Sequence, residues 1–530
     1  MLVSILLSFF YTVFFLLLIQ RLSFFKNNIV SVKYIQLAFL LKIGFGVLLI
    51  EIYSFFYTDR TTADAFKYFD DARVIYDALF IHPSHYFRMV FGIHTDANDL
   101  FPYYQKMYSW YLSDDYTVYN DSRSVIRFNA LVYPFSFGRH IVHMIFMCFI
   151  SLCGLMALFK VFSQSFHKAW MSLYLAVFLV PSVLFWGSGV LKEGLILFAV
   201  GYLVYYFFQL IQNPFKLKYA IFFLLFFLLL VAVKFHVLVS LIPGFIIVFW
   251  QHKSANTNIF WKAAMTMILL FLLSIGVSLT SFKHSPFRML VEKQEDFINL
   301  AKGGYYFQNH KYNPDTFYVP QKNANWLLQS NDSEKWSFRE GLQFYAWKNK
   351  NITDTLLVPA SDSSSYRLIM QLDSAGSKIQ IAKIKPTAWS VLSNVPQSLF
   401  NVFFRPLIFE SNNLLSMMAG FENLMFFVFL LLSIVFFKMP RKHEQIIFVF
   451  CASFVLILFS IIGMTTPVLG AIVRYKIPAL PFLCVLFMFM IDAEKLDKRF
   501  PFVTKLKSYI IDFIGIKSSG EMKDGSKTIK

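Results

Sequence analysis

Long uninterrupted apolar runs constrain this chain more than any other feature of its sequence. Several runs hold about 20 apolar residues, the length that an α-helix needs to cross a hydrocarbon core of roughly 30 Å. Charged residues make up only 15% of the 530 residues, against about 25% in ordinary soluble domains. The runs are much longer than the alternating strands of about 10 residues in a membrane β-barrel. The sequence therefore predicts an all-α polytopic membrane protein.

About eleven transmembrane helices account for these runs. The run 219–251 is too long for one ordinary span and is interrupted by Lys234 and His236. Two short spans that turn at these residues keep the basic residues before and after the run on one side, as the positive-inside rule requires. The expected spans are 1–20, 34–57, 141–159, 169–187, 193–211, two within 219–251, 261–281, 423–437, 445–463 and 477–491.

Basic residues also predict the orientation of the chain. Arg21, Lys26 and Lys33 follow the first span, so their loop is expected in the cytoplasm and the N-terminus outside. The same rule places the C-terminus in the cytoplasm and leaves two large non-cytoplasmic loops, 58–139 and 282–395. Topology therefore explains the net charge of +18, and no nucleic acid is expected as a partner.

Composition divides the chain into parts. Residues 1–281 form an N-terminal transmembrane module that contains the acidic outer loop 58–139. Residues 282–416 form a large, polar, loop-like outer segment that ends in a semi-apolar stretch, expected to be interfacial or re-entrant. The C-terminal transmembrane helices follow in 417–491, and 492–530 is a basic cytoplasmic tail. No internal repeat is detectable, which disfavours a secondary transporter.

An acidic cluster follows the second span, where the chain leaves the bilayer. Asp64, Tyr68 and Asp71 are spaced i, i+4 and i+7 and would share one helix face, whereas Asp70 would point elsewhere. A carboxylate at this boundary can take a proton from a sugar hydroxyl or hold a cation that bridges phosphate oxygens. The alternative is a solvated acidic turn after a membrane helix, and these residues alone do not separate the two.

Further ionisable residues map to the same face of the predicted membrane domain. Such residues are costly at membrane depth and by default indicate function, and arginine is suited to bidentate binding of phosphate oxygens. Each also has a structural explanation, as a helix cap, a loop residue or an anchor that snorkels to the headgroups. Their common side favours an anion-binding site. The candidates are Lys192, Glu193, Lys234, His236, Arg405, Arg474 and Lys476.

Common catalytic motifs are missing from the sequence. It contains no Walker motif, no HExxH, no GxSxG and no CxxC pair. The four cysteines all lie inside apolar segments and are expected to pack as small hydrophobic side chains. ATP hydrolysis, zinc proteolysis and serine esterase chemistry therefore have no support in the sequence.

Three short segments resemble the GT-C glycosyltransferases, multi-span enzymes that use polyprenyl-phosphate-linked sugars on the outer membrane face. The segment 64–72 resembles the acidic signature of their first large outer loop. The segment 181–193 is similar to a helix junction in bacterial relatives and in some polysaccharide polymerases, and 473–482 resembles the RYxxPxxP start of a late span. The acidic loop follows the second span here, whereas in the family it usually follows the first.

The resemblance implies a GT-C-like fold in the cytoplasmic (inner) membrane. It also implies inverting transfer of a sugar from a polyprenyl-phosphate-linked donor to a glycan or lipid acceptor on the outer face. Asp64 would be the base that activates the acceptor hydroxyl, and Asp70 or Asp71 would orient it or hold a metal. A divalent ion, Mg²⁺ or Mn²⁺, would suit this role, and the sequence leaves its requirement open. The donor phosphate would be bound by Lys192, Arg405 and Arg474.

Three other functions suit the same sequence. A polymerase of O-antigen or exopolysaccharide repeat units would share the substrate class and the large outer loops. A flippase or exporter of lipid-linked sugars would perform no chemistry and would need charged residues along a transmembrane path. A structural subunit of an envelope complex would use the two outer loops as docking surfaces. The depth of the ionisable residues in the bilayer discriminates between catalysis and passage.

Overall fold

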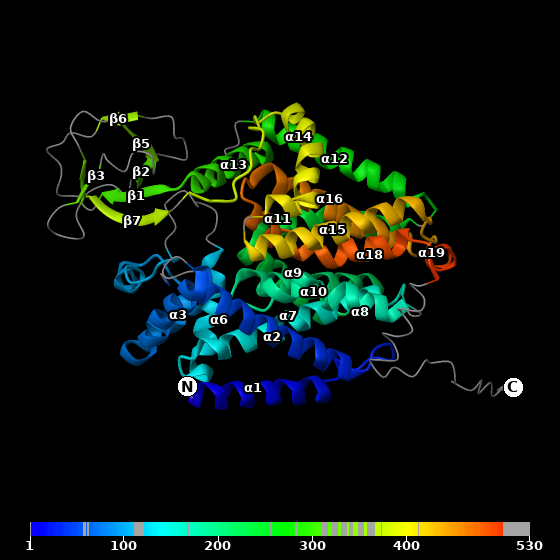
Figure 1. The fold of residues 1–530 in the computed structure, drawn as a ribbon, viewed down its shortest axis with the longest axis horizontal. Coiled ribbons are helices and arrows are strands. Elements are labelled where there is room, and N and C mark those ends of the chain that lie inside the picture. The colour runs from blue at the N-terminus through cyan, green and yellow to red at the C-terminus, as the bar shows by residue number, and fades with distance from the viewer. Residues whose placement is uncertain are drawn as a thin grey trace.

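The protein is a multi-pass helical membrane protein with a small β-sheet beyond one end of its helices (Figure 1). Nine helices in the described part of the chain are long and apolar enough to cross a membrane. The computed structural model describes residues 2–56, 60, 63–110, 121–166, 169–254, 256–280, 285–309, 316–320, 327–329, 336–338, 343–347, 355–357, 366–372, 374–411 and 413–501. The nine candidate spans are α1 (Leu2–Arg21), α2 (Val32–Phe56), α7 (His140–Phe162), α10 (Lys192–Gln212), α11 (Leu217–Lys253), α12 (Ile259–Leu279), α15 (Leu414–Val435), α16 (Gln445–Thr465) and the joined pair α17 (Leu469–Tyr475) and α18 (Leu480–Met490).

The closest helix packing is between α7 and α10. A Cβ atom on Gly154 of α7 would collide with the backbone of α10, and one on Gly201 of α10 would collide with the backbone of Gly154. Small residues allow membrane helices to approach closely, since lipid supplies no hydrophobic driving force between them. The helix α7 also packs against α1, α2 and α8 (Trp170–Phe178) and lies at the centre of the N-terminal half.

The helix α11 doubles back on itself. Lys234 has the extended backbone angles φ −161° and ψ 86° between two helical halves. The rings of Phe223 and Phe245 lie 6.1 Å apart, although a continuous helix would separate these residues by about 33 Å at 1.5 Å per residue. Both rings also contact Phe207 of α10. The predicted turn between two short helices is therefore confirmed.

The predicted span 169–187 is a broken helix. It consists of α8 and α9 (Pro181–Trp186), and Pro181 occupies the first turn of α9, where proline is well tolerated. The carbonyl of Gly187, just after α9, accepts hydrogen bonds from Lys42 Nζ at 3.0 Å and Ser151 Oγ at 2.7 Å. Residues 187–191 then connect α9 to the first turn of α10, which contributes to the candidate site.

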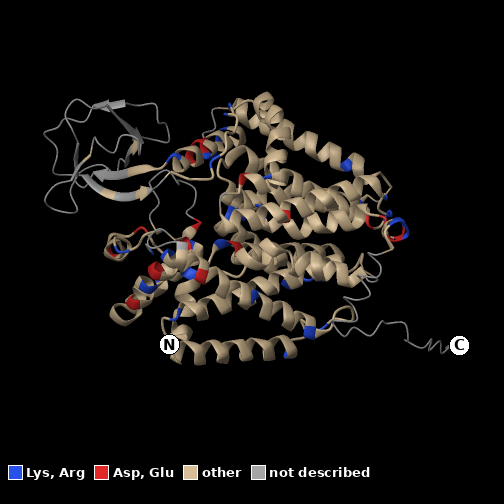
Figure 2. Cartoon of the chain, in the orientation of Figure 1, with Lys and Arg blue, Asp and Glu red and all other residues tan. Residues whose placement is uncertain are grey.

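The two large polar segments lie beyond the same end of the membrane helices (Figure 1). The first contains α3 (Asp64–Ile81), α4 (Pro83–Phe91), α5 (Phe101–Tyr104) and α6 (Ser122–Ser136), and the second contains α13 (Pro286–Lys302) and the sheet. Figure 2 shows charged residues on α3 and α13 at this end and on α19 (Ala493–Arg499) at the opposite end. Which end faces the cytoplasm stays a prediction.

The segment 282–395 contains an antiparallel sheet, so its description as loop-like is wrong. The seven strands are ordered β3-β4-β7-β1-β2-β5-β6, and the central pair β1–β7 has a register shift after Tyr306. Strands of three to seven residues are too short to show a clear alternating pattern among neighbouring Asn and Asp residues. The strands are β1 (Gly304–Asn309), β2 (Thr316–Pro320), β3 (Leu327–Gln329), β4 (Trp336–Phe338), β5 (Gln343–Trp347), β6 (Thr355–Leu357) and β7 (Tyr366–Leu372).

The semi-apolar stretch after the sheet forms α14 (Ala388–Phe404) and a short 3₁₀ turn, Ile408–Glu410. The helix packs closely on α16, because a Cβ atom at Gly463 of α16 would collide with the backbone of Ser398. Its interfacial or re-entrant position stays a prediction.

Candidate functional site

A small polar cavity of about 50 Å³ lies where the first turns of α3 and α10, the central turn of α11 and the end of α17 meet. Six of the ten candidate residues from the sequence line it, from elements that are up to 410 residues apart. Asp64, Lys192 and Arg474, which come from three distant parts of the sequence, therefore share one cavity. The lining residues are Asp64, Lys192, Glu193, Ile196, Lys234, His236, Val237, Arg474, Tyr475 and Pro478.

Helix ends position the charges of this cavity. Asp64 and Glu193 lie in the first turns of α3 and α10, where the helix dipole favours negative side chains. Arg474 lies in the last turn of α17, where the dipole favours a cation. Lys234 lies at the non-helical turn of α11. Each of these ionisable groups therefore stands where a helix begins, ends or turns.

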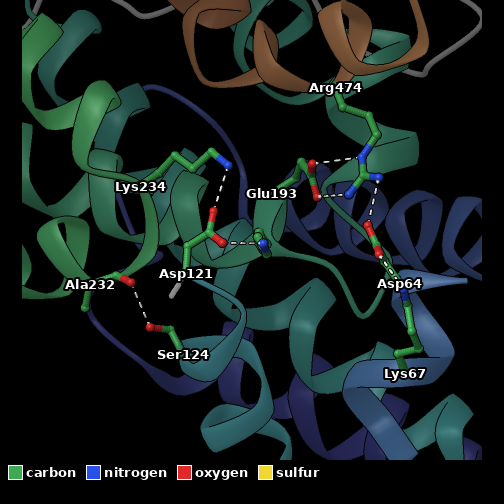
Figure 3. Close-up of polar contacts among 9 residues, drawn as sticks. Asp64, Lys67, Asp121, Ser124, Glu193, Ala232, Lys234 and Arg474 are labelled. Carbon is green, nitrogen blue, oxygen red and sulfur yellow. Dashed lines mark hydrogen bonds and ion pairs between the residues drawn. The ribbon is translucent and has the colours of Figure 1, made fainter. Parts of the chain in front are cut away.

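Arg474 joins two carboxylates (Figure 3). Its Nε donates to Glu193 Oε1 at 3.0 Å, its Nη2 lies 3.5 Å from Glu193 Oε2, and its Nη1 donates to Asp64 Oδ2 at 3.3 Å. The Glu193 side chain is 4% exposed and that of Asp64 is 36% exposed. Trp186 lies against the guanidinium, which is 5.3 Å from its ring centroid. Glu193 therefore holds the arginine firmly, and Asp64 keeps an accessible oxygen.

The charge of Asp64 is stabilised by its neighbours. Burial alone would raise the pKa of this carboxyl, but Arg474, Lys67 and Lys192 outweigh burial and hold the pKa below its ordinary value. Lys67 Nζ lies 3.5 Å from Asp64 Oδ1. Asp64 is therefore ionised at neutral pH and is ready to accept a proton.

Asp121 is a member of the site that sequence reasoning missed. It precedes α6 and accepts hydrogen bonds from Lys192 Nζ at 2.6 Å and Lys234 Nζ at 2.8 Å (Figure 3). Burial would raise the pKa of Asp121, but the two ammonium groups outweigh it and hold the pKa well below its usual range. Nothing in the sequence distinguishes this residue from the other Asp residues of a polar loop. Its charge matters because it holds two lysines from different helices side by side.

The structure does not bring Asp70 and Asp71 to the cavity, although both were candidates. Asp70 is paired with exposed Arg60 through two hydrogen bonds of 2.9 and 3.1 Å. Asp71 is fully buried and accepts the backbone N–H groups of Tyr108 and Ser109, each at 2.7 Å. Burial raises the pKa of Asp71 to about 6. Asp71 stands two helical turns, about 10 Å, beyond Asp64 and anchors the following loop instead.

Arg405 and Lys476 also lie away from the lining of the cavity. Arg405 pairs with Glu410 at 2.6 Å within one short turn. Lys476 is 2% exposed, and its Nζ donates to Asn423 Oδ1 at 2.5 Å, toward α15. Successive residues on a helix point about 100° apart, so Lys476 faces another helix although Tyr475 beside it lines the cavity.

The carboxylates of the cavity do not fit a divalent metal. Asp64 and Glu193 share Arg474, and Asp121 is held by two lysines, so all three are already paired with cations. Among the residues that the structure describes, no group of three or more His, Cys, Asp and Glu side chains could hold a metal ion.

A larger apolar groove of about 340 Å³ lies beside the charged cavity, between α9 and α15. Trp186 links the two, because it lines the groove and also stacks on Arg474. Glu422 is the acidic residue in the groove wall, and its Oε2 accepts hydrogen bonds from the backbone N–H and the hydroxyl of Ser182. The groove is lined by Pro181, Ser182, Phe185, Trp186, Leu415, Met418, Ala419, Phe421, Glu422, Met425 and Val473.

Comparisons with known proteins return no match, whether with protein-family models, curated proteins or solved structures.

Proposed function

We propose that the protein transfers a sugar from a polyprenyl-phosphate-linked donor to a hydroxyl of a glycan or lipid acceptor. The proposal includes a GT-C-like arrangement of eleven transmembrane helices, with the site on the outer face of the cytoplasmic membrane and the N-terminus outside. One observation carries it. A partly exposed carboxylate, Asp64, lies beside three cations around one cavity at the end of the membrane helices, next to an apolar groove.

The cations suit the phosphate of the donor. Lys192 and Lys234 each donate to Asp121, and an ammonium group carries three N–H donors, so their remaining donors can serve a ligand in the cavity. Arg474 offers a planar guanidinium that matches phosphate oxygens. Hydrogen bonds from charged donors to phosphate are about twice as strong as neutral ones. The leaving phosphate would gain negative charge during transfer, and these residues would stabilise that charge.

Asp64 suits the role of base. Its ionised carboxylate would take the proton of the acceptor hydroxyl as the hydroxyl oxygen attacks the anomeric carbon. The bond from that carbon to the donor phosphate oxygen would break, and the electron pair would leave with the phosphate. A single displacement inverts the anomeric centre. No second carboxylate of the cavity is free for a covalent intermediate, since Glu193 is bound to Arg474 and Asp121 to two lysines.

The apolar groove suits the lipid part of the donor. Its lining residues Phe421 and Met425 are partly exposed on the outer surface of α15, where a bilayer would contact the protein. A hydrocarbon chain could enter from the membrane at this point and place its phosphate near Arg474, beyond Trp186. Burial of apolar chain surface would contribute about 25 cal/mol per Å² to binding.

Glycan analysis of a deletion strain tests the proposal. The strain should lack one sugar-containing product, and a plasmid copy of the wild-type gene should restore it. Asp64→Asn should fail to restore the product at equal protein level, whereas Asp70→Asn, on the same helix but outside the cavity, should restore it. Restoration by Asp64→Asn would remove the chemical basis of the proposal.

A further inference from the structure

The helix α13, which leads into the sheet, is docked rigidly beside the charged cavity. Gln294 of α13 is 1% exposed, and its amide nitrogen donates to the carbonyls of Met464 at 2.7 Å and Ala382 at 2.9 Å. Its amide oxygen accepts the N–H of Ile384 at 2.9 Å. These three bonds tie α13 to the end of α16 and to the chain that returns from the sheet. The residue before Gln294 is therefore held in place relative to the membrane helices.

That residue, Lys293, is separated from the cavity by two aromatic rings, one of which lines the cavity. Its Nζ lies 4.9 Å from the ring centroid of Phe297, and the Phe297 ring lies 5.8 Å from that of Tyr475. Tyr475 lines the cavity, and Lys234 Nζ lies 4.7 Å from its ring centroid. Lys293 and Lys234 thus each lie over one ring of a tilted aromatic pair, and cations are attracted to aromatic faces at such distances.

The charges of the cavity explain why a further cation matters. Its three cations, Lys192, Lys234 and Arg474, are matched by the three carboxylates of Asp64, Glu193 and Asp121. Lys67 adds one further positive charge beside Asp64. A diphosphate carries more negative charge than this single surplus cation compensates, which is unfavourable in a partly buried site unless another cation pairs with it.

Lys293 can supply that charge. Its side chain is 38% exposed, and its ion pair with Asp296 is long, at 4.0 Å. Burial and the nearby Lys234 and Lys192 lower the pKa of Lys293 to about 8, with Asp296 and Asp121 acting in the opposite direction. An anion bound between these groups would relieve the repulsion among the lysines.

We propose that Lys293 binds the second phosphate of a diphosphate-linked lipid, so that the site selects lipid diphosphates over lipid monophosphates. The inference rests on the proposed function, because it names the donor class. In this arrangement Arg474, Lys192 and Lys234 bind the first phosphate from the membrane helices, and α13 contributes the additional cation from the extramembrane segment. The sheet-bearing segment then takes part directly in substrate choice.

Binding of two short isoprenoid probes tests this inference. Full-length protein in detergent would be titrated with farnesyl diphosphate and with farnesyl monophosphate, and binding followed by tryptophan fluorescence. The wild type should bind the diphosphate about tenfold or more tightly than the monophosphate, as expected for one added charge-assisted hydrogen bond. Lys293→Gln should lose most of this preference and keep its monophosphate affinity. Lys302→Gln, an exposed position on the same helix, is the matched control and should behave as wild type.

The other outcomes overturn the inference in distinguishable ways. An unchanged preference in Lys293→Gln, or an equal loss for both probes, shows that Lys293 does not select the second phosphate. If transfer is still lost in Asp64→Asn, the proposed function stands without this inference. If the wild type binds neither probe, both the inference and the phosphate part of the proposed function fail. Lys293→Arg should keep the preference for the diphosphate, and this result would show that Lys293→Gln loses the preference through its missing charge and not through a folding defect.

Discussion

Replacing each of the two carboxylates on Arg474 should separate a stabilising role from a chemical one. Glu193 is 4% exposed and is bound by two nitrogens of Arg474, whereas Asp64 is 36% exposed and is bound by one, at 3.3 Å. Glu193→Gln and Asp64→Asn both keep the shape of the side chain and remove one negative charge. The two variants therefore form a matched pair around one arginine.

The structure predicts different costs for the two variants. Glu193→Gln keeps one acceptor oxygen but leaves a mostly buried guanidinium with only the longer ion pair to Asp64, and breaking a buried ion pair in this way costs about 3–5 kcal/mol. Asp64→Asn leaves both contacts to Glu193 intact, and a partly exposed pair contributes about 1 kcal/mol or less. Loss of the base should nevertheless slow transfer by about 10²–10⁴-fold.

Two measurements on purified variants check this separation. Unfolding in a mild detergent, followed by tryptophan fluorescence, reports stability, and sugar transfer at saturating donor reports chemistry. Asp64→Asn should unfold close to the wild type and transfer poorly, and Glu193→Gln should unfold much more easily. If Asp64→Asn is as unstable as Glu193→Gln, the carboxylate is structural. If it transfers sugar at the wild-type rate, another group is the base.

Three further predictions concern the fold. Gly201→Val should reduce unfolding free energy by about 1–3 kcal/mol or prevent folding, since its side chain would collide with the backbone of Gly154, and thermal unfolding measures this. The unfolding free energy should fall by about 3 kcal/mol as the pH rises from about 4 to about 6. Over this range Asp71, with a pKa of about 6, keeps its proton in the folded state, while the unfolded chain loses it near 3.8. Thermal melts over a pH series measure this fall, and Asp71→Asn should remove it. Cysteines at Phe223 and Phe245, in a background without the four native cysteines, should be linked by a short bifunctional maleimide, whereas a straight α11 would hold the two thiols about 33 Å apart, beyond its reach.

The helical part of the fold was largely predictable because membrane spans have a simple physical requirement. Twenty apolar residues are visible in a sequence, and charges at Lys234 and His236 marked a turn that the backbone of Lys234 confirms. The convergence of Asp64 with Arg474 could also be predicted, since charges at span ends avoid lipid by facing a shared polar space. The same reasoning did not extend to Asp71, because a helix face shared with Asp64 says nothing about which loop packs against it.

The residues that were missed depend on tertiary packing. Asp121 lies in a polar segment, and only the approach of α10 and the α11 turn makes it the partner of two lysines. Lys293 lies on a helix of the polar segment, and the bonds of Gln294 to distant backbone groups hold that helix near Tyr475, which lines the cavity. The short strands of the sheet carry too few residues each to show a period. Pairing over long sequence separations leaves no local signal in any of these cases.

The depth of the buried charges favours chemistry at one membrane face over passage through the protein. A route for a lipid-linked sugar headgroup would need polar partners along its length. Lys42, inside α2, is fully buried, and its ammonium donates to the carbonyl of Gly187, at the helix break that leads to the cavity. Lys262 is also fully buried, and its ammonium donates a hydrogen bond to Gln251 in the last turn of α11, far along the helix from the turn at Lys234. Each lysine thus satisfies a local polar group, whereas Asp64, Glu193 and Asp121 bring their ion pairs with Arg474, Lys192 and Lys234 together at the cavity, where a hydroxyl and a phosphate could meet.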